Sequence, residues 1–153
     1  HLSACLAPIA FVVLLVGAGG GFGRALIDAG VSGALTGLAI NWHMPPLFLA
    51  FGIAAVVRLA TGSATVAMST AAPILAPFTH QAGLVSPEAM VLATGAGSVA
   101  FGPVTDPVFW QIKEYLGLSV GQTILTWSVI ETSIAVLALG GAMGFQSLTF
   151  LFS

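Results

Sequence analysis

The fold is decided by residues 46–78, which read PLFLAFGIAAVVRLATGSATVAMSTAAPILAPF. This stretch of 33 residues contains one charged residue, Arg58. As a single helix it would be about 50 Å long, which overshoots a bilayer core of about 30 Å even when the helix tilts. We therefore expect a break at 61–65, TGSAT, where small and hydroxylated residues surround a glycine. Pro73 and Pro77 are expected to interrupt the second half.

The composition of the whole chain indicates a membrane protein. Of 153 residues, three are basic and five acidic, and 58% are apolar before the 19 glycines are counted. A soluble domain is about 25% charged. It still exposes roughly 30% of its unfolded surface at this length, so water is the wrong solvent for this chain. Three basic residues and a net charge of −2 exclude a nucleic-acid partner. The single cysteine, Cys5, excludes an internal disulfide and a Cys-rich metal site. We expect neither a metal nor a cofactor.

Backbone groups in lipid must be satisfied within the segment, which leaves helices or a closed barrel. Residues 6–18 and 124–143 do not alternate between polar and apolar, so strands are excluded. We predict an all-α, polytopic membrane protein with transmembrane helices and broken or re-entrant helices. Residues 2–18 and 123–145 would be full spans, and 31–40 a re-entrant arm or buried half-helix. The chain 1–153 would be a single transmembrane domain.

A second break is expected after the apolar run 88–101, at residues 102–107, GPVTDP. Ser86 and Pro87 have the residue types of a helix start. Residues 119–123 would cap the last helix. The second break, at 102–107, would be followed by a short helix over 107–116.

Broken helices expose free N–H and C=O groups, which must line an enclosed or watery cavity. Helix N-termini suit anions there, and transporters hold substrates at such breaks. The predicted substrate-binding residues are Gly62, Ser63, Thr65, Ser98 and Arg58. Arg58 would bind a carboxylate bidentately. The alternatives are close helix packing by the small residues and an Arg58 that reaches to the membrane interface.

Two acids at membrane depth are candidates for proton coupling, with Asp106 preferred over Glu131. Such an acid costs about 2.5–3.5 kcal/mol on insertion scales. In a low-dielectric cavity it holds a proton more readily. The alternatives are that Asp106 caps the helix that follows and that Glu131 bonds to neighbouring hydroxyls. Arg24 and Asp28, four residues apart, are expected to be a structural pair.

No GxxxxGK[ST], HExxH or GxSxG motif is present. A nucleophile and base cannot be paired from the sequence either. We therefore expect that the protein is not an enzyme. The alternative to a transporter is a structural or assembly subunit of a membrane complex, in which Gly62, Ser63 and Thr65 would contact other helices and no cavity.

Three stretches carry a resemblance to a known family. They are 17–31, GAGGGFGRALIDAGV; 62–67, GSATVA; and 109–132, which includes Phe109-Trp110 and Glu131-Thr132. Together they resemble the gluconate permease family of proton-coupled symporters. The resemblance implies a multi-pass carrier in the bacterial inner membrane that takes up gluconate or a similar sugar acid with protons. It also implies that the chain is the C-terminal part of a longer permease.

The partners implied are a small carboxylate substrate, protons, the lipid bilayer and the missing N-terminal part, and a homo-oligomer is also considered. By position, Ser63 and Thr65 would belong to the substrate region, and Asp106 to the family's Asn-Asp pair. The chain departs from the expected Ser-His-Val-Asn-Asp stretch, because 102–106 read GPVTD. Asp106 is kept, while its His and Asn neighbours are not.

Overall fold

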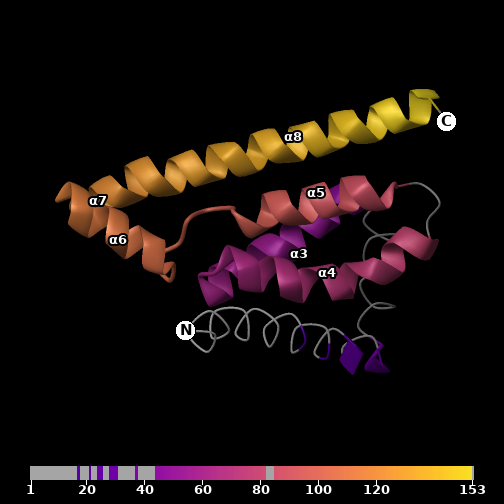
Figure 1. Ribbon diagram of the computed structural model, residues 1–153, viewed down its shortest axis with the longest axis horizontal. Coiled ribbons are helices and arrows are strands. Elements are labelled where there is room, and N and C mark those ends of the chain that lie inside the picture. Colours follow the sequence, from indigo (N-terminus) through magenta and orange to yellow (C-terminus); the bar gives the residue numbers. More distant parts are fainter. Residues whose placement is uncertain are drawn as a thin grey trace, which may run out of the picture.

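The computed structural model describes residues 44–81 and 85–152, together with positions 17, 21, 24, 25, 28–30 and 37. In the two long ranges the helices are α3 (Pro46–Thr61), α4 (Ala64–Gln81), α5 (Pro87–Ser98), α6 (Pro107–Leu116), α7 (Val120–Thr123), the π-helical turn η1 (Ile124–Ser128) and α8 (Val129–Phe152) (Figure 1). No strand occurs in these ranges. The all-α prediction is confirmed. The span predicted at 2–18 and the arm at 31–40 lie outside the described residues, apart from Gly17 and Gly37.

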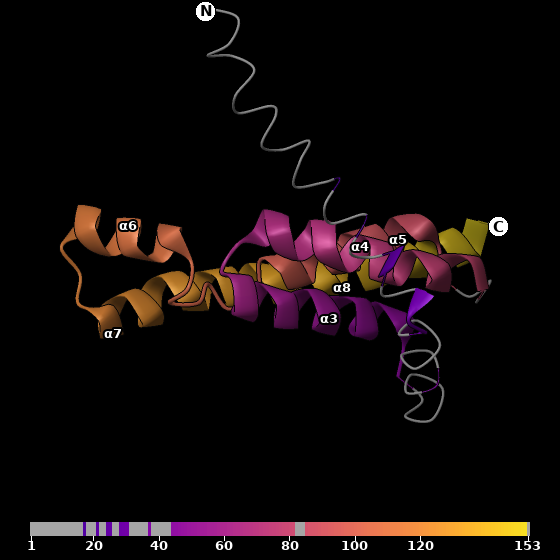
Figure 2. The same cartoon turned by 90° about the horizontal axis from the view of Figure 1, so that it is seen from below.

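The helices α3, α4 and α5 pack against one another, and α8 runs alongside α5 (Figure 1). The helices α6 and α7 lie near one end of α8, and the C-terminus lies at the other (Figure 2). The chain from η1 to α8 is continuous with α7, so one apolar helix extends over 120–151 and is long enough to cross a membrane. It begins before and ends after the predicted span at 123–145.

The interior of the bundle is built from small side chains. The buried alanines include Ala50, Ala54, Ala71, Ala89, Ala93, Ala96 and Ala142. Many large apolar side chains lie on the outside, and Leu125, Leu137 and Leu151 are each more than 70% exposed. Small residues let membrane helices approach closely, while large apolar ones face the lipid. This distribution fits a protein surrounded by hydrocarbon.

The expected break in 46–78 is confirmed. Helix α3 ends at Thr61 and α4 begins at Ala64. Between them Gly62 takes a left-handed conformation, with φ of 70°. The apolar helical stretches Pro46–Thr61 and Ala64–Ala76 are both shorter than the helix over 120–151.

The expected interruption at Pro73 and Pro77 is wrong, because α4 continues through both to Gln81. A proline removes one backbone hydrogen bond from a helix. Membrane helices tolerate that loss where neighbouring helices and hydroxyl groups compensate. Helix α4 packs against both α3 and α5, which supports it through the prolines.

The predicted helix starts are confirmed. Ala89 N–H donates to Ser86 Oγ at 3.2 Å, with Pro87 at the first position. Ser119 and Gln122 form a reciprocal capping box at the start of α7. The π-helical turn over 124–128 was not predicted. Such turns occur often at functional sites.

Helices α3 and α5 approach each other closely at Gly97, where a Cβ would lie 2.2 Å from the Phe51 carbonyl oxygen. We predict that Gly97→Ala destabilises the protein by about 1–3 kcal/mol through overpacking. Gly95→Ala is the matched control on the same helix, because its Cβ would meet only Met68 Cε at 3.9 Å. Thermal unfolding in detergent measures both variants. Equal melting temperatures would show that α3 and α5 do not meet at Gly97.

Candidate functional site

The two helix breaks meet each other. A Cβ on Gly62 would lie 2.2 Å from the carbonyl oxygen of Thr105 and 2.9 Å from the amide nitrogen of Asp106. Thr105 Oγ1 also donates to the carbonyl of Leu59 at 3.3 Å. Position 62 therefore requires glycine for two reasons: the backbone adopts a positive φ, and a second backbone segment lies where a Cβ would be. The break after α3 and the break before α6 form one junction.

Arg58 lies at this junction, in the last turn of α3, and is 2% exposed. Its Nη1 donates to the carbonyl of Gly62 at 2.6 Å. Its Nη2 donates to Asp106 Oδ2 at 2.5 Å and to Glu131 Oε2 at 3.0 Å. The interpretation that Arg58 reaches to the membrane interface is wrong, because its side chain is enclosed by the protein.

Asp106 makes two contacts, an ion pair that was not predicted and the helix cap that was expected. Its Oδ2 pairs with Arg58, and its Oδ1 accepts the N–H of Val108 at 2.8 Å. The second contact caps α6, with Pro107 at the first helical position. The capping interpretation is thus confirmed, and the same carboxylate also belongs to a buried ion cluster.

Glu131 reaches the cluster from α8 and bonds to Arg58 rather than to a neighbouring hydroxyl. It lies about 7 Å along the axis from the middle of the apolar helix 120–151, at 1.5 Å per residue. Substrate and ion sites of secondary transporters lie near the bilayer midplane. The position of Glu131 is consistent with such a depth.

The second break is held against α8 by Gly102. Ser128 Oγ donates to the Gly102 carbonyl at 2.7 Å. A Cβ on Gly102 would lie 2.6 Å from Glu131 Oε2 and 3.1 Å from Trp127 Cδ1. Phe101 and Gly102 both have positive φ, which is rare for a phenylalanine. The backbone here is strained, and strain of this kind gathers at functional sites.

The predicted hydroxyl residues are placed differently from the charged ones. Ser63 is half-buried at the start of α4, where its Oγ accepts the N–H of Val66 at 3.4 Å. Thr65 is exposed. Ser98 is buried, and its hydroxyl donates to the carbonyl of Gly95 in its own helix. The structure therefore brings Arg58, Gly62, Asp106 and Glu131 together, while substrate contact by the three hydroxyls stays a prediction.

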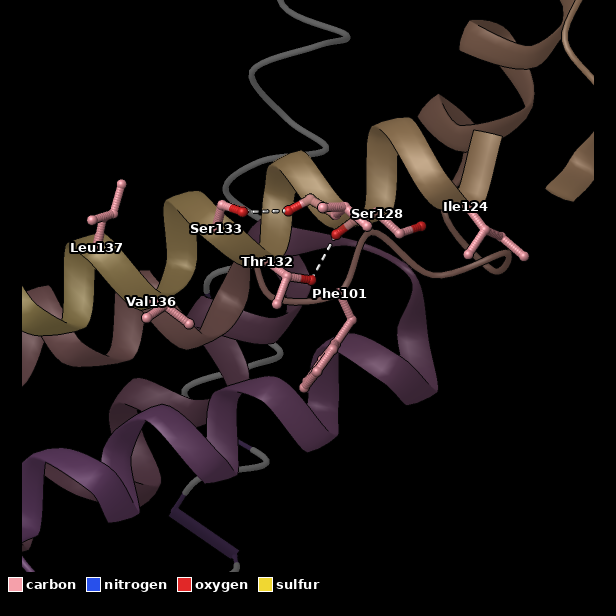
Figure 3. Close-up of a pocket in the computed structure, with 8 residues that line it drawn as sticks. Phe101, Ile124, Ser128, Thr132, Ser133, Val136 and Leu137 are labelled. Carbon is pink, nitrogen blue, oxygen red and sulfur yellow. Dashed lines mark hydrogen bonds between the residues drawn. The ribbon is translucent and has the colours of Figure 1, made fainter. Parts of the chain in front are cut away.

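Sequence reasoning missed a hollow of about 600 Å³ beside the second break. It is open and mostly apolar, and Figure 3 shows Phe101 on one side and residues of η1 and α8 on the other. The hydroxyls of Thr132 and Ser133 donate to carbonyls one turn back, those of Ser128 and Val129. Ser128 and Thr132 flank Glu131 in sequence, so this hollow borders the part of α8 that carries the acid.

Two buried N–H groups have no partner within the ranges that the structure describes, Arg58 Nε and Trp127 Nε1. Buried donors are nearly always hydrogen-bonded, so each such group needs an explanation. Both belong to residues around Glu131, since Trp127 lies against Gly102 and Arg58 bonds to the carboxylate. Nothing in the sequence indicates that these two N–H groups are buried without a partner among the described residues.

The fold and the junction define an all-helical membrane protein whose interrupted helices meet at a buried ion cluster. More particularly, the chain belongs to the GntP permease family, because the model of the GntP family permease matches residues 1–149. The resemblance found in the sequence is confirmed.

The relatives are named as carriers. A gluconate permease of Zymomonas mobilis is 48% identical over 145 residues, with 94% of this chain and 32% of the relative covered. The high-affinity gluconate transporter of Escherichia coli is 47% identical, with 88% and 31% covered. The L-idonate transporter of the Gnt-II system of Escherichia coli is 40% identical, with 93% and 32% covered. The chain thus spans about a third of the length of these relatives. No solved structure matches it.

The expectation that the protein is not an enzyme agrees with these names, which are permease and transporter. The predicted structural pair of Arg24 and Asp28 is also confirmed, at 3.1 Å and with both side chains more than half exposed. That pair lies at the surface and has no part in the ion cluster.

We predict that Arg58→Gln destabilises the protein by about 3–5 kcal/mol, because two buried carboxylates lose their cation. Arg24→Gln is the matched control, since its exposed ion pair contributes at most about 1 kcal/mol. Neutralising the acids as well, in Arg58→Gln/Asp106→Asn/Glu131→Gln, should restore part of the lost stability. Thermal unfolding in detergent measures all three variants. If the triple variant were less stable than Arg58→Gln alone, charge burial would not be the cause.

Proposed function

We propose that this chain takes part in the proton-coupled uptake of gluconate or a related small sugar acid across the bacterial inner membrane. It would act as the C-terminal part of a permease with the length of its relatives. The observation that carries the proposal is the buried Arg58 at the junction of two helix breaks, with an N–H donor that no described residue uses.

The substrate class follows from the chemistry of this junction. A guanidinium recognises a carboxylate through paired N–H donors. Helix α4 begins two residues past Gly62, and a helix N-terminus adds partial positive charge. The hydroxyl of Ser63 lies at that same end and can bond to a hydroxyl of a sugar acid. Relatives named for gluconate and L-idonate support an acid of this kind.

The charge balance of the cluster supports proton coupling. One guanidinium faces two carboxylates whose side chains are 6% and 15% exposed. An unbalanced buried charge is expensive, so the group tends to neutralise. A proton taken up by one carboxylate would balance the cluster, and its release would complete a transport cycle.

The alternative, a structural or assembly subunit, receives support from one contact. Gly62 touches the backbone of Thr105 and Asp106, as a packing residue would. Thr65, however, is exposed, and Arg58 is paired through only part of its donor set. A subunit without a substrate path needs no buried cation with an unused donor, so we favour the carrier.

We predict that the full-length permease containing this sequence accumulates labelled gluconate in cells that lack their own gluconate carriers. An inward proton gradient should drive this uptake, and an uncoupler should abolish accumulation. Empty-vector cells are the control. Full accumulation in the presence of the uncoupler would show that uptake is not coupled to protons. Absence of any uptake from a well-expressed protein would favour the structural alternative.

Within the hydroxyl cluster, we predict that Ser63→Ala lowers gluconate uptake several-fold more than Ser69→Ala. Ser69 is a suitable control because its hydroxyl already donates to the Thr65 carbonyl at 2.6 Å in the same helix. Loss of the Ser63 cap alone costs about 1 kcal/mol of stability, so uptake is normalised to the amount of folded protein. Equal normalised rates would exclude Ser63 from the substrate region.

A further inference from the structure

The donors of Arg58 can be counted one by one. A guanidinium carries five N–H groups in a planar fork. Nη1 donates to Gly62, and Nη2 donates to both Asp106 and Glu131. Both hydrogens of Nη2 are therefore used. The Nε–H is buried, and no residue in the described ranges accepts from it.

This count limits how a further carboxylate can bind. The bidentate mode uses two neighbouring N–H groups of the guanidinium, and Nε–H forms such an edge with Nη2–H. Half of that edge is unused, and Nη2, which forms the other half, already donates to the two protein carboxylates. A substrate carboxylate can occupy the whole edge only if Asp106 or Glu131 releases Nη2.

The two carboxylates are not equivalent. Asp106 has a second anchor, since its Oδ1 accepts the N–H of Val108 at the N-terminus of α6. That helix end also stabilises a negative charge. Glu131 lies in the first turn of α8, but the helix continues N-terminally through η1 and α7 to Val120, so Glu131 is not at a free helix end. Its carboxylate accepts a hydrogen bond from Arg58 Nη2. Glu131 is thus the carboxylate that can leave Nη2 at the smaller cost.

We propose that Glu131 and the carboxylate of the substrate compete for Nη2 of Arg58, and that this competition couples the proton to the substrate. The inference rests on the proposed function and names the group through which it works. A proton from the water on one side binds the Glu131 carboxylate and removes the charge that holds it to Arg58. The substrate then takes the Nε and Nη2 edge. When the substrate leaves on the other side, Glu131 gives up the proton and pairs with Arg58 again.

Asp106 stays paired with Arg58 throughout this cycle and holds it in place. The preference for Asp106 as the coupling acid, drawn from the sequence, is thereby revised to Glu131. The reason is that Asp106 is anchored by the cap of α6 as well as by Arg58.

The other charged groups of the helices around Glu131 lie elsewhere. Helix α3 contributes Arg58, and the loop before α6 contributes Asp106. Helix α5 carries Glu88 in its first turn, beside Ser86, whose N–H donates to Gln146 on α8. Gln146 is about 22 Å along α8 from Glu131. On α6, Lys113 pairs with Glu114 near the surface. The competition therefore concerns the three charges of the cluster.

Binding of labelled gluconate to the purified full-length permease, measured over a series of pH values, tests the competition. In the unaltered protein, affinity should weaken as pH rises, by up to about tenfold per pH unit for one coupled proton. Glu131→Gln mimics the protonated acid and should bind gluconate with an affinity that does not change with pH. Glu131→Asp should keep the pH dependence, and so should the control Glu88→Gln. A pH dependence in Glu131→Gln equal to that of the unaltered protein would overturn the proposal.

Transport gives a second readout. In proteoliposomes, Glu131→Gln should exchange labelled for unlabelled gluconate but lose accumulation driven by a pH gradient. Glu131→Asp should retain accumulation. Accumulation by Glu131→Gln at the level of the unaltered protein would place the proton on another group.

Chemical labelling covers the case in which Glu131→Gln does not fold. An apolar carbodiimide modifies protonated carboxyl groups in membranes, and mass spectrometry locates the label in the unaltered permease. We expect the label on Glu131, decreasing as pH rises. Label on Asp106 alone, or on neither acid, would overturn the assignment. A permease that binds no gluconate at any pH would refute the proposed function, while the labelling would still report which acid takes the proton.

Discussion

A buried guanidinium in a low-dielectric environment must have anionic partners, and this requirement organises the described part of the chain. Arg58 satisfies it with Asp106 from the loop before α6 and with Glu131 from α8. Three segments far apart in sequence are held together by one nitrogen atom. Removing one member of such a cluster leaves a buried charge without compensation, which costs several kcal/mol. The cluster is also unbalanced, with two acids for one base, so the same geometry underlies its structural role and the chemical role that we propose for it.

The breaks make this arrangement possible. A continuous helix over 46–78 would carry Arg58 in its middle, with every carbonyl of the following turn already bonded. Because α3 ends at Thr61, the Gly62 carbonyl is available to Arg58 Nη1. The left-handed Gly62 then lets the second break lie directly against the first. The last helix, in contrast, is continuous over 120–151, and Glu131 is part of this apolar span.

The departure of 102–106 from the stretch expected for the family has a structural consequence. The resemblance predicts a serine at the position of Gly102, and a Cβ there would lie 2.6 Å from Glu131 Oε2. The absence of a Cβ at position 102 therefore leaves room for the Glu131 carboxylate in the position from which it pairs with Arg58. The turn is closed by the N–H of Asp106, which donates to the Pro103 carbonyl at 2.8 Å. The chain thus keeps the aspartate while rebuilding the turn that presents it.

Local physics was sufficient to determine much of this protein from its sequence. The length of the apolar stretch 46–78 required the break at 61–65. Ser86 with Pro87 marked a helix start and Asp106 before Pro107 marked a cap, because each of these two signals depends on residues within a few positions. The same reasoning failed at Pro73 and Pro77, since packing against α3 and α5 supports a helix that propensity alone would interrupt. It also could not foresee the π-helical turn, nor that Arg58 would turn inward rather than toward the interface. Those outcomes, and the meeting of Arg58, Asp106 and Glu131, depend on contacts across 48 and 73 residues of chain. Only the tertiary structure decides which distant charges share a low-dielectric space, because the cost of burying a charge is set by its partners and not by its neighbours in sequence.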